Sequence, residues 1–244
     1  SADVVFSTDS QLVLAVQDGQ DDIDLDISGT IQEAGGTAGQ NISKQNPGTL
    51  RLSASDNNFN GLFITDGKVI VTNSGALGDN FVQGGNNATD GILEIIASAD
   101  QTFTQELRIG EQNNATGSTV TDTGSFTLLN NGAGVVMFTD GNTGFDPDTI
   151  ADRTLTLGGS NTGDNTITGE IRNHATSNVL SVVKQDAGKW VLNGNNTYTG
   201  TTSVNAGTLE IGGTNASAIT VAANAQLDGE GTTTGAIVFA GTTH

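Results

Sequence analysis

Short alternations of apolar and polar residues recur along the whole chain. In GTLRLSA, Leu50 and Leu52 flank Arg51, and in GTLEIGG, Leu209 and Ile211 flank Glu210. The same spacing places pairs of apolar residues around positions 70, 94, 108, 127, 156, 191 and 238. A period of two with one apolar face predicts half-buried β-strands, whereas the i, i+3, i+4 spacing of an amphipathic helix is missing. The pattern therefore predicts an all-β chain with no substantial α-helix.

The strands belong to a longer repeat. Residues 24–71 and 164–211 align at an offset of about 140 residues, with DLDISGTIQ matching DNTITGEIR and SKQNPGTLRL matching VKQDAGKWVL. The alignment pairs Lys44 with Lys184 and, after a slip of one residue, Phe59 with Tyr198. Repeats that cannot bury an apolar face alone stack on one another, as in solenoid proteins. We therefore expect residues 1–244 to form one domain with internal repeats.

The segments between the strands favour tight, regularly placed turns. GNNTYTGTTSVNAGTLEIGG, residues 194–213, is rich in Gly, Asn and Thr and poor in large apolar residues. Gly and Asn tolerate positive φ, and stacked Thr and Asn side chains can hydrogen-bond along a column of coils. At roughly 20–25 residues per coil, the chain predicts on the order of ten coils and a rod near 50 Å long.

These segments carry a family resemblance. LTLGGSNTGDNTITGEI and then KQDAGKWVLNGNNTYTGTTSVNAGTLEIGG resemble the autotransporter-associated β-strand repeat, or passenger-associated repeat, of large bacterial surface proteins. The likeness is close over residues 153–213 and weaker over 24–80. It implies a right-handed parallel β-helix that is exposed outside the cell, at the bacterial surface.

Charge and composition limit the kinds of partner that the chain is expected to bind. The chain has 27 acidic and 8 basic residues, a formal charge of -19, and this charge repels nucleic-acid phosphates and anionic lipid headgroups. It has no Cys and no apolar run near the roughly 20 residues of a membrane-spanning helix. We expect no nucleic-acid partner and no membrane insertion. The start at Ser1, without a signal peptide, suits a mature exported protein and equally a trimmed segment.

Enzymatic activity is the least favoured function. Polysaccharide lyases and hydrolases with this fold use clustered Asp and Glu side chains together with basic side chains in a surface cleft. Here the eight basic residues are scattered, and the two histidines, His174 and His244, lie in a polar segment and at the chain end. The sequence also lacks a G-x-S-x-G motif. We expect no catalytic residues, no resident cofactor and a non-enzymatic role.

Two acidic segments are candidates for calcium binding. Asp22, Asp24 and Asp26 alternate with apolar residues in DDIDLDIS, which predicts that their carboxylates line one face of a strand. DGNTGFDPDTIADR supplies a second candidate set, Asp140, Asp146 and Asp148. Oxygen ligands suit Ca²⁺, but neither segment has the D-x-D-x-D-G loop. The alternative is solvated charge that discourages lateral pairing of sheets.

The chain ends and the aromatic residues complete the sequence-based expectations. A β-helix without caps exposes unpaired backbone and apolar core at its ends. Both ends of this chain are strand-like and apolar. The candidate assembly residues are Val4, Val5, Phe6, Ile237, Val238 and Phe239. They predict head-to-tail association of copies into a surface filament or matrix. The alternative is a monomeric passenger or adhesin fragment that binds glycans or other surface proteins. The aromatic residues, Phe239 among them, are expected to fill the core.

Overall fold

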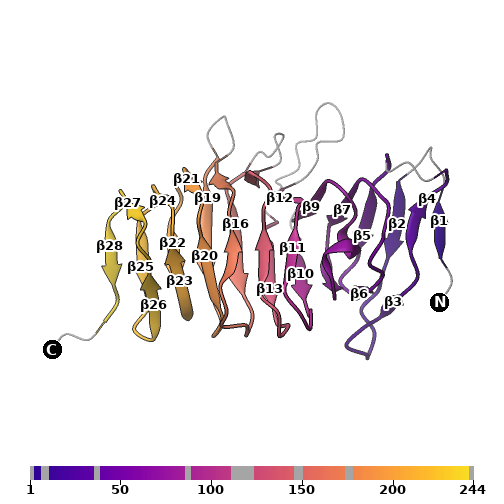
Figure 1. Ribbon diagram of the computed structural model, residues 1–244, viewed down its shortest axis with the longest axis horizontal. Coiled ribbons are helices and arrows are strands. Elements are labelled where there is room, and N and C mark those ends of the chain that lie inside the picture. Colours follow the sequence, from indigo (N-terminus) through magenta and orange to yellow (C-terminus); the bar gives the residue numbers. More distant parts are fainter. Residues whose placement is uncertain are drawn as a thin grey trace.

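The chain folds as a parallel β-helix, which confirms the predicted fold class. The structure is a computed structural model that describes residues 3–6, 11–35, 39–85, 89–110, 124–145, 151–173 and 178–241. Figure 1 shows strands that run across the long axis of an elongated body, with the two termini at opposite ends. All pairings between the named strands are parallel, between one coil and the next. Each coil therefore serves as the template for its neighbour.

The coils have three faces, which we number in chain order from the face that holds β2, the second strand. Face 1 holds a seven-stranded sheet and then a three-stranded one: β2 (Leu12–Ala15), β5 (Ile42–Gln45), β7 (Gly61–Ile64), β9 (Phe81–Gly84), β12 (Glu106–Ile109), β15 (Asn142–Phe145), β18 (Glu170–Arg172), β21 (Asn195–Asn196), β24 (Thr214–Asn215) and β27 (Thr232–Thr233). The backbone N–H of Thr197 donates to Ile171 O, so the second sheet continues the first.

Face 2 holds an uninterrupted ten-stranded sheet, which confirms the expected order of ten coils. Its strands are β3 (Leu25–Ile27), β6 (Thr49–Leu52), β8 (Gly67–Val71), β10 (Gly91–Ile95), β13 (Phe126–Asn130), β16 (Arg153–Gly158), β19 (Leu180–Lys184), β22 (Thr202–Val204), β25 (Ile219–Val221) and β28 (Ile237–Phe239). The coils are not of one length: Ile27 pairs with Leu52, 25 residues on, and Val204 with Val221, 17 residues on.

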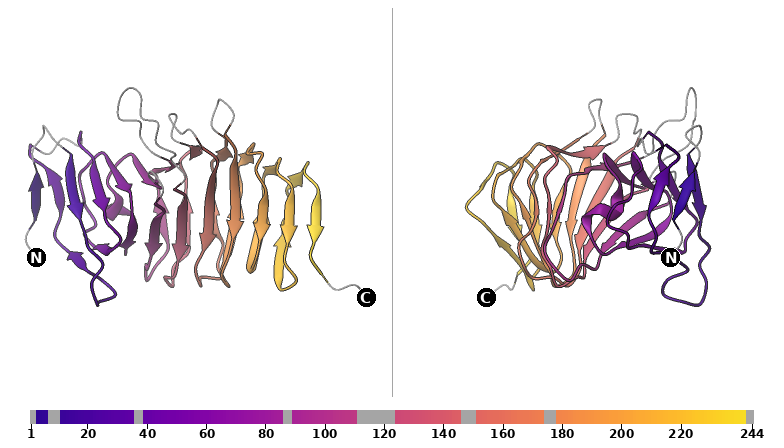
Figure 2. Two further views of the ribbon diagram at one scale, coloured as in Figure 1. Left: turned by 180° about the vertical axis from the view of Figure 1, so that it is seen from behind. Right: turned by 45° about the vertical axis from the view of Figure 1, so that its right-hand side comes forward.

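Face 3 is the irregular face. Its strands are β1 (Val4–Phe6), β4 (Ile31–Glu33), β11 (Gln101–Phe103), β14 (Val136–Phe138), β17 (Asn165–Ile167), β20 (Lys189–Leu192), β23 (Gly207–Ile211) and β26 (Ala225–Asp228). Between β4 and β11, the described residues of this face form only an isolated bridge at Asn58 and one short 3₁₀ helix, η1 (Ser74–Leu77). The two views in Figure 2 show the same stack of coils from behind and obliquely.

A single column of apolar side chains fills the interior. The inward pairs predicted from the alternation, such as Leu93 with Ile95 and Leu155 with Leu157, are inaccessible to solvent. Two details of the expectation were wrong. Ile237 and Phe239 are 41% and 65% exposed, because β28 is an edge strand of the ten-stranded sheet and no described strand pairs with its outer side. Glu94, expected to face water, is only 8% exposed and accepts hydrogen bonds from Lys68 and Asn131.

The two repeats occupy different faces of the coil. In the first repeat the lysine strand β5 lies on face 1 and the chain turns into β6 on face 2. In the second repeat the lysine strand β19 lies on face 2 and the chain turns into β20 on face 3. The repeated sequence is thus displaced by one face around the helix axis. The described residues include no helix long and apolar enough to cross a membrane.

Candidate functional site

A fully buried lysine fixes the turn of the second repeat. Lys184 Nζ donates hydrogen bonds to the backbone oxygens of Gln185 at 2.6 Å, Asp186 at 2.9 Å and Ala206 at 3.0 Å. The first two acceptors belong to the turn that follows the lysine, and Ala206 belongs to the coil stacked on it. The ammonium group therefore satisfies three carbonyls at once and ties two coils together.

The first repeat uses the same device. Lys44, also fully buried, donates to the backbone oxygen of Asn46 and, at 2.8 Å, to that of Asp66 in the next coil. Burial lowers the pKa of each lysine to about 8, against the opposing pull of Asp66 and Asp24 at Lys44 and of Asp186 at Lys184. The sequence offered the signal for this role, because Lys is one of the residues that recur at the repeat offset.

The backbone of these turns explains the residues around the lysines. Asn46 and Asp186 have φ of 70° and 60°, and they are the non-glycine residues of positive φ in the described chain. Gly67 and Gly207 follow with φ of 72° and 64°, and a Cβ on Gly207 would lie 2.4 Å from a backbone oxygen. Only glycine fits there, since both the dihedral and the space exclude a side chain. These features define a structural corner and supply no reactive group.

The first predicted calcium segment is occupied by its own protein contacts. Asp24 accepts backbone hydrogen bonds from Gly19 at 2.6 Å and Thr49 at 2.7 Å. Asp26 pairs with Arg51, whose hydrogen bond lowers the pKa of that carboxyl group. Asp22 is exposed and precedes β3, as Asp24 does, so of the three carboxylates predicted to line a strand only Asp26 lies within one. The described residues contain no group of three or more acidic or histidine side chains placed to hold a metal ion.

The second predicted calcium segment is only partly described. Asp140 is half-buried two residues before β15, whereas Asp146 and Asp148 lie outside the described residues. The two histidines considered as bases, His174 and His244, also lie outside them. Calcium binding at this segment stays a prediction.

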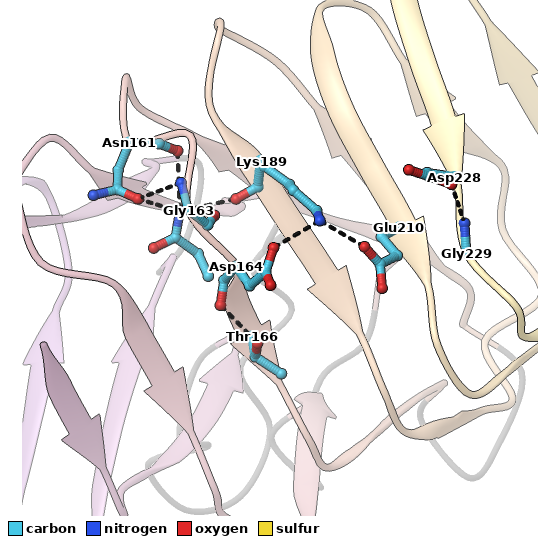
Figure 3. Close-up of polar contacts among 9 residues, drawn as sticks. Asn161, Gly163, Asp164, Thr166, Lys189, Glu210, Asp228 and Gly229 are labelled. Carbon is cyan, nitrogen blue, oxygen red and sulfur yellow. Dashed lines mark hydrogen bonds and ion pairs between the residues drawn. The ribbon is translucent and has the colours of Figure 1, made fainter.

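An ion-pair cluster on face 3 links three coils. Figure 3 shows Lys189 of β20 between Asp164, which precedes β17, and Glu210 of β23, with Nζ–O distances of 2.6 Å to each. These two hydrogen bonds raise the pKa of Lys189. Asp228 of β26, the next carboxylate along the face, accepts the backbone N–H of Gly229 at 2.8 Å. Carboxylates on both sides balance the charge of the lysine, so this arrangement holds three neighbouring coils together.

A polar cleft lies where face 3 is irregular. It has a volume of about 340 Å³, and its lining comes from three successive coils: residues 55–58, then 74, 75, 78 and 79, then 102, 104 and 105. It includes two exposed carboxylates, Asp56 and Asp79, and the buried amide of Gln105. Sequence reasoning missed this cleft. Its signal was the segment SGALGDN, residues 74–80, which interrupts the strand alternation on which the other coils are built.

At each end of the β-helix, the terminal coil exposes one edge strand on every face. The edges are β1, β2 and β3 at one end and β26, β27 and β28 at the other. Of the candidate assembly residues at the first end, Val5 is 58% exposed, Val4 is half-buried and Phe6 is only 9% exposed. At the other end β28 is exposed throughout, with Val238 at 56%. Beside β28, the open end of the core forms a cavity of about 250 Å³ lined partly by Ile211, Leu227 and Ile237.

Comparison with known proteins finds likenesses over parts of this chain. The chain is 45% identical over 85 residues to the "Adhesin BmaC autotransporter" of Brucella suis biovar 1 (strain 1330). That likeness covers 35% of this chain and 2% of the adhesin, so the chain spans a very small part of its relative's length. No solved structure matches the chain. The family described as passenger-associated-transport-repeat matches residues 42–71 and 182–211, the two lysine-turn repeats, so the chain carries two such repeats.

Proposed function

We propose that this chain is a non-enzymatic structural segment of a surface-exposed bacterial autotransporter passenger, and that it acts as a stiff extracellular spacer. The observation that carries the proposal is the ten-stranded sheet of face 2, in which every coil pairs with the next. A stack of coils at about 4.8 Å each extends the chain along one axis, so added coils add length without a new core design. The adhesin relative supports a place outside the cell.

Two measurements test the spacer. Small-angle X-ray scattering of residues 1–244 should give a rod near 50 Å long, as about ten stacked coils require. An antibody against these residues should label intact cells that make the full-length protein. Labelling that appears only after the cells are permeabilised would contradict surface exposure.

A second candidate function, head-to-tail association into a filament, rests on the open terminal rungs. In such a contact β26 of one copy would lie on β1 of the next, β27 on β2 and β28 on β3, so each face would continue in phase. The exposed Ile237 and Phe239 would then cover Leu25 and Ile27, the inward residues of β3. A heterologous contact of this kind propagates, because every added copy presents a new open end.

Charge sets the conditions for that association. Both ends are acidic, with Asp21 and Asp22 before β3 and with Asp228 and Glu230 at and just after the end of β26, so the approaching surfaces repel. Salt screens this repulsion, and we expect assembly to rise with ionic strength.

Negative-stain electron microscopy over a protein concentration series tests the filament. Fibres of uniform width should form, and Phe239→Asp should abolish them by placing a charge in the apolar contact. Met137→Asp is the matched control, because Met137 is 41% exposed on the lateral surface of β14, away from both ends. Single rods at every concentration and salt would rule out the filament and leave the spacer intact.

A further inference from the structure

We propose that the peptide bond between Asn46 and Pro47 is a self-cleavage site, broken by attack of the Asn46 side-chain amide on its own backbone carbonyl. The inference goes beyond the spacer function, which requires no reaction. The bond lies in the lysine turn of the first repeat, between β5 and β6. Because the chain cuts itself once and acts on no other molecule, the reaction is compatible with a structural role.

The reacting carbonyl is already polarised by a cation. Lys44 Nζ donates a hydrogen bond to the backbone oxygen of Asn46 and is held in position by a second bond, at 2.8 Å, to Asp66 O. When a nucleophile adds to the Asn46 carbonyl carbon, negative charge develops on that same oxygen. A buried, preorganised ammonium group stabilises this charge, so the lysine that builds the turn also lowers the barrier to addition.

The side-chain amide of Asn46 is the nucleophile. Its Nδ2 can close a five-membered ring with the backbone carbonyl carbon of the same residue, and an intramolecular addition gains from proximity. Among the described residues, none holds this side-chain amide by a hydrogen bond. Asn46 also has a φ of 70°, in the left-handed region, so a break after it releases a constrained residue.

Pro47 directs the amide toward cleavage. In other sequences the backbone nitrogen of the residue after asparagine attacks the side-chain carbonyl and deamidates it, but proline has no N–H with which to do so. That competing route is closed at Asn46, and attack on the backbone carbonyl stays open. Pro47 is exposed, so water can protonate its nitrogen as it leaves.

The step balances with water alone. Nδ2 of Asn46 bonds to the backbone carbonyl carbon, and the bond from that carbon to the Pro47 nitrogen breaks. Nδ2 gives one proton to water and the Pro47 nitrogen takes one from water. The products are a C-terminal succinimide at residue 46 and a free N-terminus at residue 47. A water molecule then opens the imide to a carboxylate and an amide.

The second lysine turn keeps the cation and lacks the nucleophile. Lys184 Nζ donates to Asp186 O at 2.9 Å, as Lys44 does to Asn46 O. The next residue is Ala187, and the Asp186 carboxylate accepts the backbone N–H of Gly159 at 2.9 Å. A carboxylate has no nitrogen with which to form an imide, so we expect cleavage at the first turn and none at the second.

Strand pairing keeps the two products together. β5, before the cut, is paired with β2 and β7, and β6, after the cut, is paired with β3 and β8. Residues 1–46 therefore become a separate chain that stays bound to the β-helix and dissociates only on unfolding.

The experiment is mass spectrometry, under denaturing conditions, of residues 1–244 incubated for a long period at neutral pH with protease inhibitors. Fragments 1–46 and 47–244 should accumulate at a first-order rate that does not depend on protein concentration. Fragment 1–46 should first appear lighter by one water than the same fragment with a free carboxylate, which marks the succinimide. A contaminating protease gives only the heavier form.

Matched variants separate the chemistry from the fold. Asn46→Gly should abolish the cleavage and keep the turn, because glycine adopts a φ of 70° without strain. Lys44→Met should slow the cleavage by about 10²-fold, because the developing oxyanion loses its donor. Lys184→Met removes the equivalent contact in the other repeat and should leave the rate unchanged.

Three results would overturn the inference. They are a chain that stays intact, an Asn46→Gly variant that is cut at the same bond, and an equal slowing by the two lysine substitutions. Each of these results leaves the rod shape and surface exposure, and so the spacer, unaffected.

Discussion

The two lysine-turn repeats, residues 42–71 and 182–211, make the same corner at different places on the coil. The first turns from face 1 to face 2 and the second from face 2 to face 3, yet both keep a buried lysine, a positive-φ residue two positions later and a glycine in the next coil. The repeated sequence therefore specifies a local bend and its tie to the coil above it. It does not specify which face of the solenoid receives that bend, because all three corners require a similar change of direction.

The interiors of the two repeats differ in polarity. Phe59 of the first repeat is surrounded by apolar groups and lies against Gly78. Tyr198 in the matching place of the second repeat reaches Thr202 at 2.6 Å, in a buried network that continues to Ser217. Leu62 takes the position of Thr202 in the first repeat, because it pairs with Ile42 as Thr202 pairs with Val182. A corner can thus be closed by hydrocarbon or by hydrogen bonds, provided that each buried polar group is satisfied.

The largest expected effect comes from removing the lysines. Lys44→Met and Lys184→Met should each lower the free energy of unfolding by about 2–4 kcal/mol, because buried carbonyls lose their donor. The loss should be greater for Lys184, which serves three carbonyls. Urea unfolding followed by circular dichroism measures both. Arg51→Met, which breaks an exposed ion pair, is the control and should change little. Equal behaviour of all three variants would contradict the proposed role of the lysine turn.

The next effect concerns the residue after the turn. Trp190 is fully buried and its Nε1 donates to Gly158 O at 2.9 Å, whereas Leu50 holds the matching place in the first repeat. Trp190→Leu should cost about 2–3 kcal/mol through the cavity and the unpaired carbonyl. Leu50→Trp should cost about 1–3 kcal/mol through overpacking. If either exchange left the urea midpoint unchanged, the two corners would be more tolerant of volume than their burial indicates.

Comparison of the two repeats also shows what could be predicted from the sequence. Alternation and repeat spacing predicted the strands, most inward residues and the stacking of repeats, because each of these depends on local pattern, whereas the parallel β-helix was implied by the family resemblance. The displacement of the repeats by one face could not be predicted, since coil length varies and the intervening coils decide the phase. The cleft depends on η1 and on Gln105, which gains its setting only from coils distant in sequence. The calcium candidates relied on charge density and alternation, which do not report what Asp24 or Asp26 contacts.

Exchange of the aromatic pair should have a smaller effect. Tyr198→Phe should lower the free energy of unfolding by about 1 kcal/mol, through loss of the hydrogen bond to Thr202. Phe59→Tyr should cost about 1–3 kcal/mol, because Leu62, in the place of Thr202, offers the new hydroxyl no partner. The double-mutant cycle of Tyr198→Phe with Thr202→Val measures the coupling directly. A coupling energy near zero would show that the hydroxyl contributes nothing to this corner.

The lysines also predict a pH dependence. Their folded pKa of about 8 lies below the unfolded value of 10.5, so between these two pH values the unfolded chain binds more protons. The free energy of unfolding should therefore rise from pH 7 to pH 9.5, by about 1 kcal/mol per lysine once solvent screening near the turn is allowed for. Lys189 and Tyr198, whose pKa values are raised, act only above this range. Lys44→Met and Lys184→Met should each flatten the rise, and an unchanged slope in both would contradict the assignment.

The smallest effect separates the two positive-φ residues. Asn46→Gly should stabilise the chain by up to about 0.5 kcal/mol, since glycine adopts a φ of 70° without strain and this gain exceeds the added freedom of the unfolded chain. Asp186→Gly gains the same relief but loses the hydrogen bond from Gly159 N to Asp186 Oδ2 at 2.9 Å, so it should destabilise by about 0.5 kcal/mol. Thermal unfolding of the two variants side by side resolves the difference in sign. Two shifts of the same sign would mean that the Asp186 carboxylate adds nothing to its corner. The two repeats would then differ in their interiors alone.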